Sequence, residues 1–281
     1  MKHGKSPYTT TFYLWNGVAA FFYASHLTSF HSHNTMQLVL DTHTDFRLKV
    51  KGEAWKTYKS LIIRENVIHQ LDTKNSVQLI VYLDPATSIA EAIKSKYLGD
   101  NEVCPLDLNI FHFVNANDVE QALLHSDPTL LEKLVNRILE SLSLDIPVRR
   151  TDKRVIAVEQ IISTAHPEKL SIKMLAHKAC LSESRLRALF SEVTGITLYR
   201  YILWNKIKFA TNQIMAGFSV NDAAIDAGFT DSSHFHKMMV KMFGVSPSKF
   251  LKDNKEFSEV KCEESALHFE TNVYRKARES S

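Results

Sequence analysis

Few features of the chain are typical of a secreted or membrane-spanning protein. Its 281 residues include only three cysteines, and Cys104, Cys180 and Cys262 lie far apart without forming a CxxC motif. This usage indicates free thiols in a reducing compartment rather than a disulfide framework. No stretch reaches 18 apolar residues, no tract is of low complexity, and the first residues lack the apolar core of a signal peptide. We therefore expect a soluble, cytoplasmic protein, long enough for about two domains.

The chain also lacks a strong overall charge, because its formal net charge is only +3. The charge is unevenly distributed, however. Residues 151–250 contain 13 Lys and Arg against 8 Asp and Glu, a net charge of +5, whereas residues 1–150 contain 15 against 16 and residues 251–281 contain 6 against 7. The excess positive charge therefore lies in one region, as expected of a domain that binds phosphates.

This basic region contains one pattern written twice, in residues 171–196 and again in residues 219–245. Each copy predicts a short helix, a tight turn and a longer helix, which together make a helix-turn-helix unit. Each copy begins with a serine suited to cap a helix N-terminus, and Gly195 and Gly244 follow the longer helices where a left-handed terminus favours glycine. A single helix over about residues 197–216 joins the copies. Twenty helical residues span ~30 Å, close to the ~34 Å of one DNA turn, so the longer helices can enter successive major grooves.

The residues of both copies strongly resemble the AraC/XylS family signature, over about residues 154–250. The resemblance is carried by Leu181-Ser182, Ser184-Arg185-Leu186, Leu189-Phe190, Thr194-Gly195, Asp222-Ala223-Ala224, Ala227-Gly228-Phe229, Asp231, Ser233-His234-Phe235, Phe243-Gly244-Val245-Ser246-Pro247 and Phe250. It implies a bacterial transcription regulator with double-stranded DNA and RNA polymerase as partners.

The family resemblance also implies which residues face DNA. These are Glu183, Ser184, Arg185 and Arg187 in the first copy, Ser232, Ser233, His236 and Lys237 in the second, and Lys206 on the joining helix. The chain departs from the family at Ala188, where a long polar residue is common, and Arg187 can take over that contact. Met239 and Val240 stand where Phe-Lys is usual. For the arginines, the competing interpretation is an ordinary solvated helix face.

The N-terminal half predicts short strands, rich in β-branched and aromatic residues, over about residues 12–85. The clearest are Val18–Tyr23, Met36–Leu40, Phe46–Val50, Ser60–Ile63 and Val77–Leu83, and the helices expected after them are Ala86–Tyr97, Asp118–His125 and Pro128–Leu142. The predicted fold is a mainly β, cupin-like barrel with following helices in residues 1–145. A linker at 146–153, an all-α DNA-binding domain at 154–251 and a charged tail at 252–281 follow it.

A group of histidines in the predicted barrel is a candidate ligand site. His31 and His33 alternate along the chain, so both can point into the barrel, with Gln37 four residues later and His69 on a facing strand. The group looks like a degraded cupin motif in which Gln37 replaces a glutamate ligand. Loss of the anionic ligand weakens a divalent-metal site, so we expect an anionic or polar organic effector, no cofactor and no tightly held metal. A vestigial site without an effector, or three histidines that still bind a metal, are the alternatives.

The helix expected at residues 128–142 has a wide apolar stripe formed by Leu131, Leu134, Val135 and Ile138. Such a stripe either packs on its own domain or binds a second copy of the chain, and we expect a homodimer formed through these residues.

The function expected from the sequence is a sequence-specific DNA-binding transcription regulator, an activator, controlled through its N-terminal domain by an effector or by dimerisation. We expect no enzymatic activity. The alternatives are a cupin metalloenzyme fused to a DNA-binding module and a DNA-binding module on a plain dimer scaffold. An intact glutamate at position 37 would have favoured the enzyme.

Overall fold

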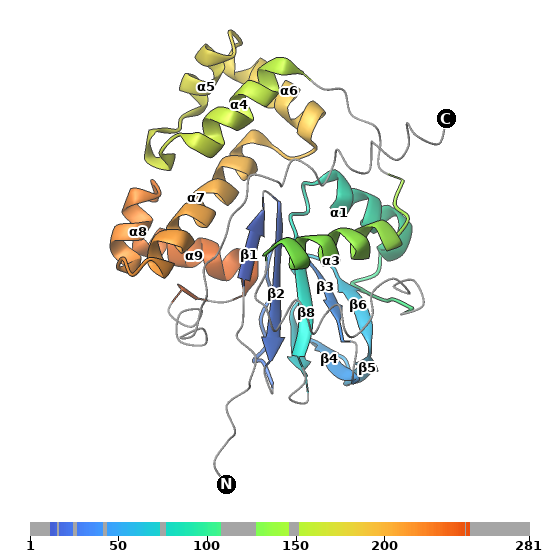
Figure 1. Ribbon diagram of the computed structural model, residues 1–281. Helices are drawn as coiled ribbons and strands as arrows, with labels where there is room; N and C mark the ends of the chain where they lie inside the picture. Colours follow the sequence, from blue (N-terminus) through green and yellow to red (C-terminus); the bar gives the residue numbers. More distant parts are fainter. Residues whose placement is uncertain are drawn as a thin grey trace.

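The computed structural model describes residues 12–15, 17–24, 27–41, 44–73, 77–107, 128–145, 152–244 and 246–247. It consists of an N-terminal part dominated by β-sheets and a C-terminal part made of helices (Figure 1). This arrangement confirms the predicted mainly β N-terminal domain followed by an all-α domain. Within the described residues, no helix is both long enough and apolar enough to cross a membrane.

The N-terminal domain contains two antiparallel sheets. One has the strand order β1-β2-β8-β3-β6-β9 and the other the order β5-β4-β7. The strands are β1 Phe12–Trp15, β2 Val18–Ala24, β3 Met36–Leu40, β4 Phe46–Val50, β5 Lys56–Tyr58, β6 Ser60–Ile63, β7 His69–Asp72, β8 Val77–Leu83 and β9 Val103–Pro105. All five strands named from the sequence are confirmed. The sheet extends beyond the expected limit at residue 85, because β9 pairs with the edge strand β6.

The larger sheet is buried on both faces because its central strands alternate between two apolar clusters. Leu38 on β3 and Val81 on β8 face a cluster that also includes α1 (Ser88–Ile93) and α3 (Pro128–Ser141). Their neighbours Val39 and Ile80 face the opposite cluster, with Phe46 of the smaller sheet. The π-helical turn η1 (Lys94–Leu98) extends α1, so the helix expected at Ala86–Tyr97 is confirmed. The helix expected at Asp118–His125 lies outside the described residues.

The C-terminal domain consists of helices arranged around α7. They are α4 Lys153–Thr164, the short η3 Pro167–Lys169, α5 Ile172–Lys178, α6 Glu183–Thr194, α7 Leu198–Met215, α8 Val220–Asp226 and α9 Ser232–Phe243. Helix α4 begins within the predicted linker, because Asp152 caps it by accepting a hydrogen bond from the Arg154 amide. Trp204, at the centre of α7, is fully buried.

The two domains share one apolar cluster at their contact. The rings of Tyr82 on β8 and Trp204 on α7 both pack against Phe243 at the end of α9, with centroid distances of 5.7 and 5.6 Å. Figure 1 shows α7 and α9 beside the strands β1 and β2. The position of α9 relative to the sheets is therefore set by direct packing.

Candidate functional site

The two predicted helix-turn-helix units are present, and local capping forms each one. Ser171, Ser182, Ser219 and Asp231 each accept a hydrogen bond from the backbone amide three residues later at a helix N-terminus. Gly195 and Gly244 adopt left-handed conformations at the C-termini of α6 and α9, as predicted.

The turns inside the two units have matching backbone conformations. Cys180 stands between α5 and α6 with φ of 54°, and Gly228 stands between α8 and α9 with φ of 77°. A side chain is strained in this conformation, and only the second unit avoids that strain with glycine. The repeat seen in the sequence is thus a repeat of backbone geometry.

The residues expected to read DNA lie on the outer faces of α6 and α9. Glu183, Ser184, Arg185, Arg187, Ser233, His236 and Lys237 are exposed, and Ser232 is partly exposed. Arg187 donates a hydrogen bond to the Glu183 carboxylate at 3.3 Å, one turn earlier on α6. This pairing holds the guanidinium against the helix surface.

Lys206 lies elsewhere and has a structural partner. Its ammonium donates a hydrogen bond of 2.7 Å to the carbonyl of Gly228, the turn residue of the second unit. Burial lowers the pKa of Lys206 from its usual range. In this conformation Lys206 ties α7 to the turn before α9.

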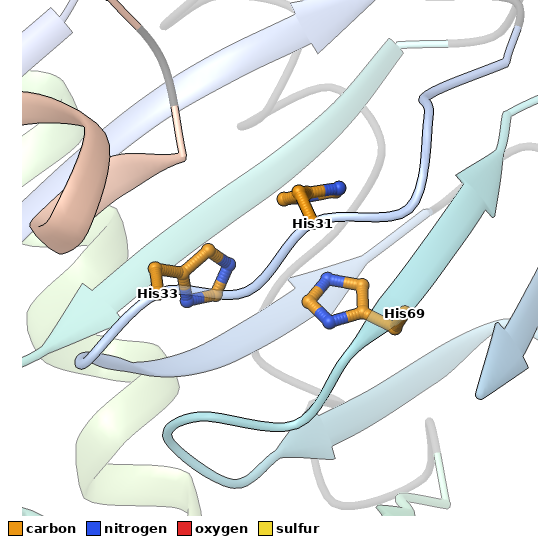
Figure 2. Close-up of side chains that lie close together, drawn as sticks. All are labelled: His31, His33 and His69. Atoms are coloured by element: carbon orange, nitrogen blue, oxygen red, sulfur yellow. The ribbon is translucent and has the colours of Figure 1, made fainter. Parts of the chain in front are cut away.

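The three histidines of the candidate ligand site meet in the structure. Their ring centroids are 4.6 to 5.7 Å apart, and one ligand atom from each lies within 4.8 Å of the others. Figure 2 shows His31 and His33 on one extended segment and His69 facing them from β7. The alternation argument assumed that His31 lies in a strand, but it forms only an isolated β-bridge. It pairs with His69 through two backbone hydrogen bonds.

Backbone carbonyls orient all three imidazoles in the same way. The Nδ1 atoms of His31, His33 and His69 lie 2.8, 3.1 and 3.0 Å from the carbonyl oxygens of Ser29, Thr35 and Val67. A carbonyl only accepts hydrogen bonds, so each Nδ1 carries the proton. When such a ring is neutral, its lone pair is on Nε2.

The site contains hydrogen-bond acceptors without donors. The Nε2 atoms of His33 and His69 and the Oε1 atom of Gln37 are buried and have no hydrogen-bond partner among the described residues. Gln37 lies on β3 beside His33. These atoms can bind a cation or a hydrogen-bond donor.

Electrostatics keep the buried histidines neutral. Burial, together with the neighbouring His31, lowers the pKa of His33 to about 4. Burial and the neighbouring His33 and His31 lower the pKa of His69 to about 3. His33 and His69 therefore add no positive charge that would favour an anionic effector.

The histidine site lies directly against the end of the second reading helix. A Cβ atom at Gly244 would stand 2.9 Å from Cδ2 of His31 and 3.3 Å from Cδ2 of His33. Any side chain at this position would collide with the imidazoles. Gly244 is thus required both by its backbone conformation and by this close approach.

The N-terminal domain also satisfies the last carbonyls of α9, which have no partner within the helix. The Lys241 carbonyl accepts from the Asn34 amide at 2.7 Å, the Met242 carbonyl from the Thr35 hydroxyl at 2.5 Å, and the Phe243 carbonyl from the Tyr82 hydroxyl at 3.1 Å. The segment that contains two of the histidines therefore caps α9.

A second link joins the N-terminal domain to α7. The buried carboxylate of Asp84, at the end of β8, accepts hydrogen bonds from Arg200 Nε and Trp204 Nε1, both at 2.7 Å. Asp84 directly follows the strand predicted at Val77–Leu83, and no role was predicted for it from the sequence. No local pattern distinguishes it or Thr35, because their partners are more than 100 residues away.

The structure buries the apolar stripe of α3 that was expected to form a dimer interface. Leu131, Leu134, Val135 and Ile138 are buried in the cluster beneath α3 and are at most 3% exposed. They pack on the chain's own sheet, so they cannot form an interface while the domain is folded. The wide apolar stripe is explained by the width of the sheet face that α3 covers.

Comparisons with known proteins agree with the repeated units. The helix-turn-helix domain family matches residues 175–253. The probable transcriptional regulator LumQ of Photobacterium leiognathi is 23% identical over 233 residues, which are 79% of this chain and 91% of LumQ. The uncharacterized HTH-type transcriptional regulator YidL of Escherichia coli K12 is 34% identical over 100 residues, which are 34% of each protein. The structure of ToxT from Vibrio cholerae O395 aligns with a TM-score of 0.44 and 12% identity, covering 90% of this chain and 100% of ToxT.

The matched family covers the part of the chain in which the two capped units and their exposed polar faces were found. LumQ and YidL are both described as transcriptional regulators. The repeated units and these relatives show that the chain carries a C-terminal helix-turn-helix domain and is a DNA-binding transcription regulator.

Proposed function

We propose that this regulator is an activator whose DNA-reading helices are controlled by a small effector bound at His31, His33, Gln37 and His69. The observation that carries the proposal is that the segment with His31 and His33 also caps α9 through Asn34 and Thr35. An effector that changes this segment therefore changes the support of a reading helix. Effector binding and DNA binding are then energetically coupled.

The proposed DNA complex places α6 and α9 in successive major grooves on one face of the duplex. Arg185 and Arg187 on α6, with His236 and Lys237 on α9, contact bases or phosphates there. The exposed positions of these residues support this arrangement. The protein acts in the cytoplasm as a homodimer and recruits RNA polymerase, with a dimer interface outside the buried stripe of α3.

The proposal is tested by mapping the DNA bound by the full-length protein across the genome of its source organism, followed by footprinting on the sites found. We expect protection of two major-groove segments on one face, about one helical turn apart. Affinity should fall steeply with salt, because Lys and Arg contacts to phosphates release counterions. Protection of only one groove would contradict the two-site geometry.

A further inference from the structure

We propose that His31, His33 and His69 bind a late first-row divalent transition metal, best matched by Zn²⁺, through their Nε2 atoms, and that metal occupancy is coupled to the position of α9. This names the chemical class of the effector proposed above, and only its regulatory consequence rests on that function. It departs from the expectation of a metal-free site, which considered only the missing glutamate.

The donor set determines the class of ion. Three imidazole nitrogens suit Zn²⁺, Ni²⁺ or Cu²⁺, whereas Mg²⁺ and Ca²⁺ prefer oxygen ligands. The hydrogen bonds from each Nδ1 to a backbone carbonyl are the outer contacts that fix imidazole tautomers at metal sites. With the proton on Nδ1, Nε2 is the nitrogen that can bind a metal, and one ligand atom from each histidine lies within 4.8 Å of the other two.

Unpaired buried acceptors supply a second, independent argument. Burying a polar atom without a partner is costly, and the site holds such atoms on His33, His69 and Gln37. A cation bound between the rings would satisfy the Nε2 atoms of His33 and His69. The adjoining C-terminus of α9 carries partial negative charge, which partly compensates for the absence of an anionic side chain.

The spacing of the histidines indicates how metal binding affects the cap of α9. Nitrogen ligands of a tetrahedral Zn²⁺ stand ~3.4 Å apart, given Zn–N distances of about 2.0–2.1 Å. The ligand atoms here lie within 4.8 Å of one another, so binding draws the rings inward. His31 and His33 flank a short segment whose next residues, Asn34 and Thr35, hold the last carbonyls of α9. Closing the site therefore moves or stiffens the cap of the reading helix.

The first test is metal binding by the untagged full-length protein, stripped with a chelator and dialysed against Zn²⁺, Ni²⁺ or Mg²⁺. We expect one equivalent of Zn²⁺ and no Mg²⁺ by elemental analysis. Partly exposed His31 is the variant site of choice, and His31→Ala should weaken Zn²⁺ binding by about 100-fold or more. His177→Ala, at an exposed histidine on α5, is the matched control and should leave it unchanged.

A second variant is designed to bind Zn²⁺ more tightly, because misfolding alone would also abolish Zn²⁺ binding in His31→Ala. Gln37→Glu adds an anionic ligand beside His33 and should tighten Zn²⁺ binding by about tenfold or more. Absence of stoichiometric Zn²⁺, equal binding by His31→Ala and His177→Ala, or no gain in Gln37→Glu would overturn the metal site.

The second test measures amide hydrogen exchange with and without Zn²⁺. We expect changed protection at residues 31–35 and at the C-terminal end of α9 in the natural protein, but not in His31→Ala. Metal binding without a change at α9 would overturn the coupling. None of these measurements uses DNA, so a failure of the proposed regulatory function is distinguishable from a failure of the metal site.

Discussion

Asp84 and Trp204 are joined by a hydrogen bond of 2.7 Å from the indole Nε1 to a fully buried carboxylate, across the contact between the two domains. The same carboxylate oxygen accepts from Arg200. One aspartate at the end of a strand thus orients the helix that joins both DNA-reading units. The energetic consequences of this contact and of the α9 cap can be measured separately.

Replacing Asp84 with alanine should destabilise the protein by about 2–4 kcal/mol, because the Trp204 N–H and part of the Arg200 guanidinium are left buried without an acceptor. Chemical denaturation measures this free energy of unfolding. Asp100→Ala, at an exposed aspartate of the same domain, should change it by less than about 0.5 kcal/mol. A similarly small loss in Asp84→Ala would mean that the domain contact does not depend on this carboxylate.

Thr35→Val keeps the shape of the side chain but removes the donor to the Met242 carbonyl. We expect a loss of about 1–2 kcal/mol in stability and faster amide exchange at the C-terminal end of α9. Thr57→Val, at an exposed threonine on β5, is the control. If exchange in α9 stays the same in Thr35→Val, the N-terminal domain does not support the reading helix.

Arg187→Ala should weaken binding to a mapped genomic site by ~1–3 kcal/mol and relax the preference at one base pair, as for a bidentate base contact. Binding assays on the natural site, its single-base variants and random DNA measure both effects. Arg137→Ala, on α3 of the other domain, should leave all three affinities unchanged. Equal losses on specific and random DNA would assign Arg187 to the phosphate backbone.

Leu134→Glu should unfold the N-terminal domain rather than dissociate a dimer, because it places a carboxylate in the cluster beneath α3. The expected loss of stability is at least about 3–5 kcal/mol. Leu130→Glu, at a 36% exposed position of the same helix, should be tolerated. A stable, folded but monomeric Leu134→Glu protein, seen by sedimentation with unchanged circular dichroism, would restore the stripe as an interface.

Much of the C-terminal domain follows from the sequence because its determinants are local. The serines that cap α5, α6 and α8 bond amides three residues away, and Gly195 and Gly244 end helices in a conformation that disfavours other residues. Exposure of Arg187 likewise follows from its place opposite the buried face of α6. The strands β2, β3, β4, β6 and β8 were recognisable from their apolar, β-branched residues.

The tertiary structure alone decided how these parts meet. Alternation of His31 and His33 indicated that their side chains point the same way, and each ring is oriented by a carbonyl only two residues away. The position of His69 beside them depends instead on its backbone pairing with His31, 38 residues earlier in the chain. The apolar stripe of α3 is equally suited to a sheet or to a partner, and only the sheet beneath it resolves the choice. Thr35 and Met242 are separated by 207 residues, so no local preference predicts their bond. It exists because two domains pack with the end of a reading helix against a histidine site.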